Sequence, residues 1–305
     1  PPSLKEGQKA PLNFYTGSGG GSAGKVKSME EGAEICGWIV ACSVESRNGL
    51  PDADYPKHTD RCLKSLFATL PIDQEQVYFT GNSGGARTAY TSSKRVKSAG
   101  VLAVIAGGQE DELSKSLNYY MISGSTDYNR YDTSHSFAAV RKNSALRFHP
   151  GPHEDGPGWM VIEGMVWLQA AWYEKAQAPP AQRAAFEDAA ATWVKGLKTS
   201  APQRAAWWAD FFKTRLTGPR KTEIAALAAE LTAVPENASY IKGIAELEEF
   251  ADTVLAKEGP YYKPGHTTPE IQRKADKILQ DHVNTPWINE IATELKKPVV
   301  GTKKK

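Results

Sequence analysis

The sequence is poor in cysteine, has no long apolar run and carries no excess of either charge. The 3 cysteines, Cys36, Cys42 and Cys62, form no CxxC pair and have no histidine beside them at metal-ligand spacing. We therefore expect no metal site built on cysteine. The cysteines fit buried free thiols, and one disulfide with an odd cysteine left over is the alternative.

Charge and hydropathy restrict the partners of the chain. Lysine and arginine total 37, and aspartate and glutamate total 35, so no strong field favours nucleic acid or an acidic membrane. No apolar run approaches the ~18 residues that a membrane-spanning helix needs. The chain opens with PPSLKEG rather than methionine. This fits removal of an export signal from a periplasmic or secreted protein, and a cytoplasmic location is the alternative. The sequence does not indicate the oligomeric state.

Residues 11–177 contain apolar segments of strand length that alternate with helical segments. The expected strands are 11–16, 37–44, 76–81, 101–108, 119–124 and 145–149. The expected helices are about 28–36, 59–70 and 157–178, and one that begins near residue 84. Ser28 and Glu31 form a capping-box pattern at the start of the first helix. The alternation predicts a mostly parallel sheet flanked by helices. Because the run 37–44 is apolar and β-branched, we expect it to be buried on both faces.

Residues 178–305 differ because no segment among them has a convincing strand pattern. The expected helices, separated by prolines, are about 181–197, 203–216, 221–233, 237–257, 268–283 and 286–296. We therefore expect two domains. An α/β domain covers residues 1–177, and an all-α C-terminal domain of unknown role covers residues 178–305.

The segment GSGGGSAGKV (residues 17–26) fits three kinds of glycine-rich loop. As G-x-x-x-x-G-K ending at Lys25, it matches the phosphate loop of nucleotide hydrolases. As G-x-G-x-x-G ending at Gly24, with Glu45 downstream to hold a ribose, it matches a dinucleotide-binding loop. It also suits an acyl-transfer enzyme whose loop donates backbone N–H groups to an oxyanion. The rest of the chain has to decide between the three.

The stretch Gly81-Asn82-Ser83-Gly84-Gly85 is a G-x-S-x-G motif between an expected strand and an expected helix. Such a turn forces the serine into a strained conformation, and the outer glycines let strand and helix approach each other. The turn raises the serine hydroxyl above the carboxyl edge of the sheet, where the N–H of Gly84 faces developing negative charge. We predict that Ser83 is a catalytic nucleophile and that Gly84 is an oxyanion donor.

A serine nucleophile needs a base, and the base needs an acid that fixes its tautomer. Asp127 follows the expected strand 119–124, and His153 follows the last expected strand, 145–149. The three side chains then lie on loops at one edge of the sheet, in the chain order serine, aspartate, histidine. We predict that His153 is the catalytic base and that Asp127 orients it.

Other acids and histidines have suitable chemistry in less suitable places. Asp111 and Asp132 are substitutes for Asp127, whereas Asp155 lies too close to His153 in sequence to orient it easily. The remaining histidines are weaker candidates, because they belong to a strand or helix or have no suitable neighbours: His58, His135, His149, His266 and His282.

Residues 11 to about 177 resemble the α/β-hydrolases. In particular they are similar to small bacterial serine esterases of the dienelactone hydrolase, polyhydroxybutyrate depolymerase-like and feruloyl esterase-like kinds. The resemblance rests on the motif around Ser83, on Asp127 and His153 as its partners, and on TGSGGG (residues 16–21) as the loop after the family's third strand. It implies a catalytic domain over residues 1–177.

In this family the loop after the third strand usually supplies the second oxyanion donor. The resemblance therefore implies that the backbone N–H of Ser18 or Gly19 takes that role beside Gly84. The family often has His-Gly at the start of this loop, where this chain has Thr16-Gly17. Because about ten residues precede the first expected strand, the resemblance also implies a sheet that is shortened at its N-terminal edge.

An oxyanion loop explains the glycines together with Ser83, Asp127 and His153. A phosphate loop lacks its magnesium-binding hydroxyl here, because Val26 stands where serine or threonine is required. We therefore expect a serine hydrolase that cleaves small-molecule or polymer esters through an acyl-enzyme, without metal or organic cofactor. Peptide or thioester cleavage, a non-catalytic binding or scaffold role, and nucleotide binding through residues 17–26 remain alternatives.

The sequence does not define the substrate-binding residues. Six aromatic residues could line a cleft and are equally suited to the core or the surface: Tyr55, Tyr119, Tyr120, Tyr128, Tyr131 and Trp159. The substrate and its acyl size are therefore left open.

Overall fold

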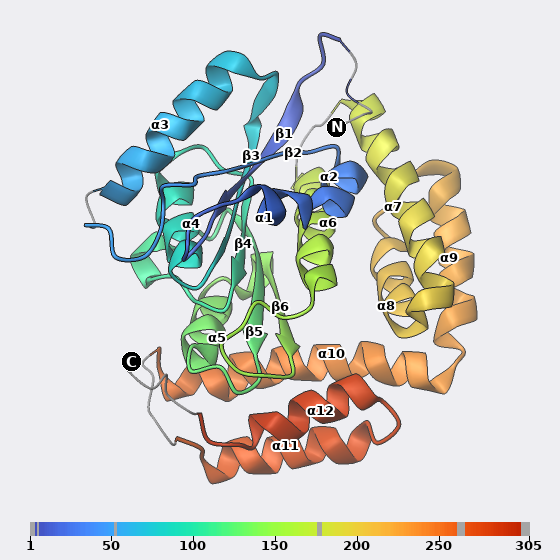
Figure 1. Ribbon diagram of the computed structural model, residues 1–305. Helices are drawn as coiled ribbons and strands as arrows, with labels where there is room; N and C mark the ends of the chain where they lie inside the picture. The colour runs from blue at the N-terminus through green and yellow to red at the C-terminus, as the bar shows by residue number, and fades with distance from the viewer. Residues whose placement is uncertain (1–3, 5, 52–53, 176–178, 261–265, 300–305) are drawn as a thin grey trace.

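The computed structural model describes residues 4, 6–51, 54–175, 179–260 and 266–299 (Figure 1). At its centre six parallel strands form one sheet in the order β2-β1-β3-β4-β5-β6. The strands are β1 (Ala10–Thr16), β2 (Ile39–Cys42), β3 (Ile72–Asn82), β4 (Gly100–Val104), β5 (Asn118–Gly124) and β6 (Ser144–His149). The parallel sheet predicted from the sequence is confirmed.

The strand order changes direction at β1, because β2 lies on one side of it and β3 on the other. In open α/β sheets such a switch point leaves a crevice at the carboxyl ends of the strands, and ligands bind there. The glycine loop follows β1, and the turn that holds Ser83 follows β3. The two loops singled out in the sequence therefore lie side by side at the switch point.

β2 is an edge strand, and its residues are only half-buried. The prediction of a strand over 37–44 that is buried on both faces is therefore wrong in both length and burial. β2 pairs along one side only, with Leu12 opposite Ile39 in β1. An apolar, β-branched run indicates a strand, but it does not reveal whether that strand lies at the centre or at the edge of the sheet.

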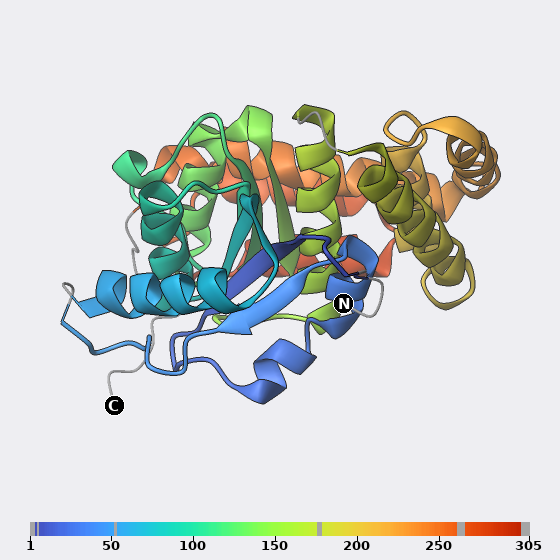
Figure 2. The same cartoon turned by 90° about the horizontal axis from the view of Figure 1, so that it is seen from above.

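Helices cover both faces of the sheet (Figures 1 and 2). They are α1 (Ala23–Lys27), α2 (Glu30–Cys36), α3 (Asp54–Thr69), α4 (Gly84–Arg95), α5 (Arg130–Ala139) and α6 (Gly158–Lys175), with short 3₁₀ helices η1 (Glu110–Glu112) and η2 (Arg141–Asn143). Successive strand residues point to opposite faces. Phe79 accordingly packs in the apolar cluster with α3, α4 and α5, whereas its neighbour Tyr78 packs in the cluster with α2 and α6.

The capping-box prediction at Ser28 is wrong. A short helix, α1, already begins after Ser22, whose side chain accepts a hydrogen bond from the Lys25 N–H at 3.3 Å. Ser28 therefore lies at the end of α1, where its hydroxyl donates to the Lys25 carbonyl at 2.8 Å. The next helix, α2, begins after Met29 without a side-chain cap.

The C-terminal region is all α among its described residues, as predicted. Its helices are α7 (Pro180–Ser200), α8 (Pro202–Phe212), α9 (Gly218–Thr232), α10 (Pro235–Thr253), η3 (Leu255–Glu258), α11 (Pro269–Asp281) and α12 (Pro286–Leu295). In Figure 1, α7, α8 and α9 stand beside α6, while α10 crosses below β6. Trp208 shares an apolar cluster with α6, and Ile244 shares one with the opposite face of the sheet. The division into two domains at residue 177 stays a prediction.

Two further properties concern the chain as a whole. Within the described residues no helix combines the length and the apolar character that crossing a membrane requires. Cys36, Cys42 and Cys62 are free thiols, of which only Cys36 is buried. Burial raises the pKa of the Cys36 thiol, so this group stays protonated and packs as a small apolar side chain.

Candidate active site

Ser83 occupies the turn between β3 and α4 in a strained backbone conformation. Its φ is 51° and its ψ is −121°, a region that residues other than glycine rarely adopt. A Cβ atom on Gly81 would lie 2.3 Å from the Gly85 carbonyl oxygen, and one on Gly85 would lie 2.0 Å from the Thr16 carbonyl oxygen. Glycine is therefore required on both sides of Ser83, as the motif predicts.

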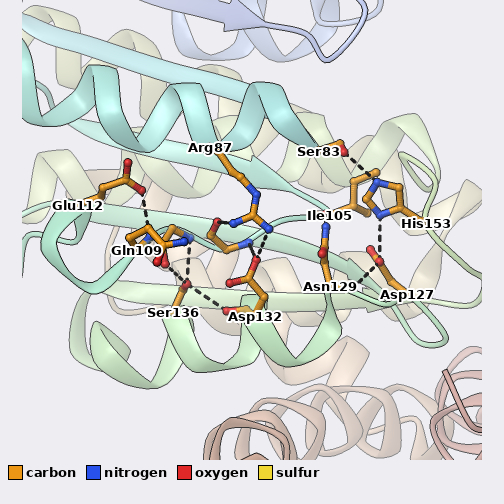
Figure 3. Close-up of polar contacts among 12 residues, drawn as sticks. Ser83, Arg87, Ile105, Gln109, Glu112, Asp127, Asn129, Asp132, Ser136 and His153 are labelled. Atoms are coloured by element: carbon orange, nitrogen blue, oxygen red, sulfur yellow. Dashed lines mark hydrogen bonds and ion pairs between the residues drawn. The ribbon is translucent and has the colours of Figure 1, made fainter. Parts of the chain in front are cut away.

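His153 lies within hydrogen-bonding distance of both Ser83 and Asp127 (Figure 3), and we call these three residues the loop array. The Ser83 Oγ lies 2.8 Å from the His153 Nε2, and the His153 Nδ1 lies 2.9 Å from the Asp127 Oδ1. The residues come from the loops after β3, β6 and β5 respectively. Serine therefore faces one ring nitrogen, and a carboxylate faces the other.

Asp127 is fully buried, and its carboxylate is held in place by the residues around it. The Asp127 Oδ1 accepts a second hydrogen bond from the Asn129 N–H at 2.8 Å. The Asn129 side chain in turn donates to the Ile105 carbonyl at 2.8 Å. Ile105 has a φ of 55°, which is costly for a β-branched residue. This strained residue follows β4, so the backbone at the edge of β4 helps to fix the Asp127 loop.

The alternative acids are engaged elsewhere. The Asp132 Oδ2 accepts hydrogen bonds from the Arg87 guanidinium at 2.7 Å and from the Gly107 N–H at 3.0 Å. Burial raises the pKa of the Asp132 carboxyl, while the Arg87 charge opposes that shift. Asp111 is exposed and pairs with Lys94. Neither aspartate contacts a histidine among the recorded hydrogen bonds of the described residues.

His149, the rival base nearest in sequence, braces the loop that carries His153. Its ring is fully buried at the end of β6. The Nδ1 lies 2.9 Å from the Pro150 carbonyl oxygen, and the Nε2 lies 3.1 Å from the Glu154 carbonyl oxygen. His149 therefore joins both ends of the short segment that contains His153.

The glycine loop contacts the Ser83 turn directly. Thr16, which stands where the α/β-hydrolases often have histidine, is buried and donates its hydroxyl to the Gly85 carbonyl at 2.7 Å. The Ser18 N–H donates to the Asn82 Oδ1 at 3.1 Å. Within the described part of the chain, the N–H groups of Gly19 and Gly84 form no hydrogen bond. Of the three amides predicted as oxyanion donors, Ser18 is therefore already engaged.

Asn82 links the glycine loop to the histidine loop, a role that the sequence did not reveal. Its Oδ1 also accepts from the Tyr15 hydroxyl at 3.0 Å, and its Nδ2 donates to the Asp155 Oδ1 at 2.7 Å. The Lys25 ammonium donates to the Asp155 Oδ2 at 2.6 Å. The G-x-S-x-G pattern leaves position 82 unspecified, so no motif could have identified this residue.

The same contacts bear on the two nucleotide interpretations of the glycine loop. Lys25, which a phosphate loop would aim at a phosphate, forms an ion pair with Asp155. Glu45, which a dinucleotide loop would aim at a ribose, pairs with Arg61 and His58 on the surface. The helix after the loop, α1, has 5 residues. The side chains that suggested nucleotide binding are therefore used for other contacts.

Tyr128 is the aromatic residue that packs against the loop array. Its ring centroid lies 4.3 Å from that of His153, at an interplanar angle of 31°. Burial raises the pKa of the Tyr128 hydroxyl, and the negative charge of Asp127 adds to the shift. The ring restricts the movement of the imidazole on one side. Three of the other aromatic candidates are core residues instead: Tyr119, Tyr120 and Tyr131.

A cavity of about 740 Å³ lies between the C-terminal helices and the start of α6. Trp159 and Trp287 line one part of it, with ring centroids 5.5 Å apart. No residue of the loop array lines it. Within the described ranges no group of three or more histidine, cysteine, aspartate or glutamate side chains is arranged to hold a metal ion.

Comparisons with known proteins found distant structural similarity. No protein-family model and no curated protein matches the chain. A thermostable esterase shares 16% identity over 55% of this chain and 56% of its own, with a TM-score of 0.39. An esterase from Pyrobaculum calidifontis shares 12% sequence identity over 57% of this chain and 79% of its own, with a TM-score of 0.41. The AtxE2 isopeptidase shares 14% sequence identity over 62% of this chain and 40% of its own, and its TM-score is also 0.41. This chain thus spans little more than half the length of the first esterase.

Proposed function

We propose that this protein is a serine hydrolase that cleaves carboxylic esters through an acyl-enzyme intermediate. The observation that supports this most is the loop array, in which Ser83, His153 and Asp127 are joined by contacts of 2.8 and 2.9 Å. Serine, imidazole and carboxylate in this sequence of contacts are the groups that acyl transfer requires. Their place at the carboxyl edge of a parallel sheet is where substrates of such folds bind.

In the first half of the reaction, Ser83 attacks the ester carbonyl while the His153 Nε2 accepts the hydroxyl proton. The Asp127 carboxylate holds the proton on Nδ1 and stabilises the imidazolium that forms. His153 then donates its new proton to the departing alcohol, which leaves Ser83 acylated. In the second half, water loses a proton to His153 and attacks the acyl group, so the acid is released and the serine hydroxyl is restored.

The tetrahedral intermediates carry a negative oxygen that needs hydrogen-bond donors. We assign this role to the N–H groups of Gly84 and Gly19, which form no hydrogen bond within the described residues. Each donor of this kind contributes ~3 kcal/mol to lowering the barrier. Ser18 is the weaker candidate, because its N–H already donates to Asn82. Using it would first require breaking that hydrogen bond.

Brief mixing with p-nitrophenyl acetate followed by mass spectrometry tests the proposal. We expect one acetyl group on the proteolytic peptide that contains Ser83, together with a burst of p-nitrophenol. His153→Ala should form neither, because the hydroxyl then has no base. A wild-type protein that turns over no p-nitrophenyl ester and gains no acyl group would contradict the assignment. Thioester and peptide substrates compared in the same way would define which acyl groups are accepted.

A further inference from the structure

We propose that Glu294, on α12, is a positioning residue that holds the Asp127 loop and the His153 loop in register. The catalytic part of this inference rests on the proposed function, whereas the geometric part can be measured without it. Glu294 belongs to the all-α C-terminal region, for which the sequence suggested no role. The proposal gives the end of that region a specific task at the candidate active site.

The two loops run side by side up to the residues of the loop array. The Ser125 N–H donates to the His149 carbonyl at 2.9 Å, and the Thr126 N–H donates to the Gly151 carbonyl at 3.0 Å. These bonds extend the pairing of β5 and β6 beyond the ends of the strands. Asp127 comes directly after Thr126, and His153 follows Gly151 by two residues. The pairing therefore sets how Asp127 faces His153.

Glu294 forms hydrogen bonds to both loops where this pairing ends. Its Oε2 accepts a hydrogen bond from the Gly151 N–H at 2.5 Å and a short hydrogen bond from the Ser125 hydroxyl. The Gly151 N–H also lies 3.1 Å from the Ser125 Oγ. The Glu294 side chain is only 19% exposed. Hydrogen bonds to a largely buried carboxylate are among the stronger ones in proteins, so Glu294 holds one residue of each loop together.

A second contact joins the end of α12 to the same loop. Arg130 is fully buried on α5, and its guanidinium donates to the Ser125 carbonyl at 2.6 Å and to the Lys297 carbonyl at 3.4 Å. Ser125 is therefore held through its hydroxyl by Glu294 and through its carbonyl by Arg130. Because the Lys297 carbonyl accepts from the same Arg130 guanidinium, Arg130 links the chain after α12 to the Asp127 loop.

The packing leaves little space for the loops to shift without moving His153. Gly151 has a φ of 123°, which glycine adopts most readily. A Cβ atom on Gly124 would lie 2.2 Å from the Pro152 carbonyl oxygen. Loss of the Glu294 contact would leave Gly151 held to the Asp127 loop by the Ser125 Oγ and the Thr126 N–H alone, and His153 follows two residues later. A misplacement of about 1 Å in a catalytic group can lower a rate by about 10²-fold.

The kinetic test compares Glu294→Ala, Glu294→Gln and the control Glu290→Ala. For Glu294→Ala we expect kcat on p-nitrophenyl acetate to fall by about tenfold to a hundredfold, with KM nearly unchanged. Glu294→Gln should restore most of the activity, because its carbonyl oxygen accepts from the same two donors. Glu290 is exposed on α12, so its replacement removes an equal charge from the same helix and should leave kcat unchanged.

The geometric test uses nuclear magnetic resonance of protein labelled with ¹⁵N in histidine. We expect Glu294→Ala to shift or broaden the Nδ1–H signal of His153, whereas Glu294→Gln and Glu290→Ala should keep the wild-type signal. If Glu294→Ala fails to fold, Ser125→Ala removes one of the two donors and should change the same signal less. A wild-type His153 signal in both Glu294→Ala and Ser125→Ala, or in Ser125→Ala alone if Glu294→Ala does not fold, would overturn the proposal. If the wild type hydrolyses no ester, the proposed function fails, and this signal still decides the role of Glu294.

Discussion

A second serine–histidine–carboxylate group lies among the C-terminal helices, and it invites comparison with the loop array. It consists of Ser239, His282 and Glu246, and we call it the helix array. The Ser239 Oγ lies 2.9 Å from the His282 Nδ1, and the His282 Nε2 lies 2.9 Å from the Glu246 Oε2. The contacts agree with those of the loop array to within 0.1 Å, so the distances and the kinds of functional group do not distinguish the two arrays.

The two arrays differ in the orientation of the imidazole and in the use of the serine hydroxyl. In the helix array the Nδ1 faces serine and the Nε2 faces the carboxylate, the reverse of the loop array. The Ser239 Oγ also accepts a hydrogen bond from the Thr285 hydroxyl at 2.7 Å. Ser239 therefore connects α10 to the residue before α12, which is a contact suited to holding helices together.

The backbone around the two serines also differs. Ser239 lies within α10, where helical hydrogen bonds use the backbone amides, and the His282 side chain is 0% exposed. Ser83 lies in a strained turn next to the amide of Gly84, and the His153 side chain is 17% exposed. If Ser83 is the nucleophile, as we propose, its site is distinguished from that of Ser239 by a partly exposed base and by the neighbouring amide of Gly84, the features that acyl transfer requires in addition to the three side chains.

The largest expected effect separates the two serines. Ser83→Ala should lower kcat/KM for p-nitrophenyl esters by at least about 10⁴-fold, because the attacking group is lost and only binding and oxyanion donors remain. Ser239→Ala should leave kcat/KM within about twofold of wild type. Steady-state kinetics measures both. Similar losses in the two variants would mean that the loop array is not the reacting group.

The next effect separates the two carboxylates. Asp127→Asn should lower kcat by about 10⁴-fold, because an amide favours the wrong histidine tautomer. Glu246→Gln should leave kcat near the wild-type value, because the proposed reaction uses the loop array and not the helix array. Stopped-flow measurement of the acylation burst distinguishes slower acyl transfer from slower release of product. A fast burst in Asp127→Asn would contradict the role proposed for this aspartate.

Much of the loop array could be predicted because each of its members follows a strand in the sequence. The glycines around Ser83 encode the turn, and parallel strands bring the loops after β5 and β6 to the same edge. The Asn82 contacts and the Glu294 contacts could not be predicted in this way. Glu294 is separated from Gly151 by 143 residues, and no pattern relates a helix at the end of the chain to a loop in the sheet.

The helix array, in contrast to the loop array, could not be predicted from the sequence. His282 has no suitable neighbours in sequence, yet the structure places Ser239 and Glu246 on either side of its ring. These two residues lie on one helix, α10, and His282 follows α11. Which helices pack together depends on apolar contacts along their whole length. The sequence gives the helices and their approximate ends, but it does not give their neighbours.

The smallest expected effects are changes in the free energy of unfolding, which should have opposite signs when glycine replaces each of the two serines. Ser83→Gly should raise the free energy of unfolding by about 1 kcal/mol. Relief of a strained φ contributes roughly 1–3 kcal/mol, and the greater freedom of glycine in the unfolded chain returns about 0.5–1 kcal/mol of this. Ser239→Gly should instead lower it by about 1–2 kcal/mol, because glycine is a poor helix residue and the hydroxyl loses its bonds to His282 and Thr285. Thermal or urea unfolding followed by circular dichroism measures both changes.

Ser83→Ala serves as the control for this pair, because alanine removes the hydroxyl and keeps the Cβ atom that is strained at a φ of 51°. Its stability should therefore stay within about 0.5 kcal/mol of wild type. If Ser83→Ala were stabilised as much as Ser83→Gly, the gain would come from removing the hydroxyl and not from the backbone. The turn would then carry no strain, and the two serines would differ in the orientation and exposure of their histidines and in the Thr285 contact of Ser239.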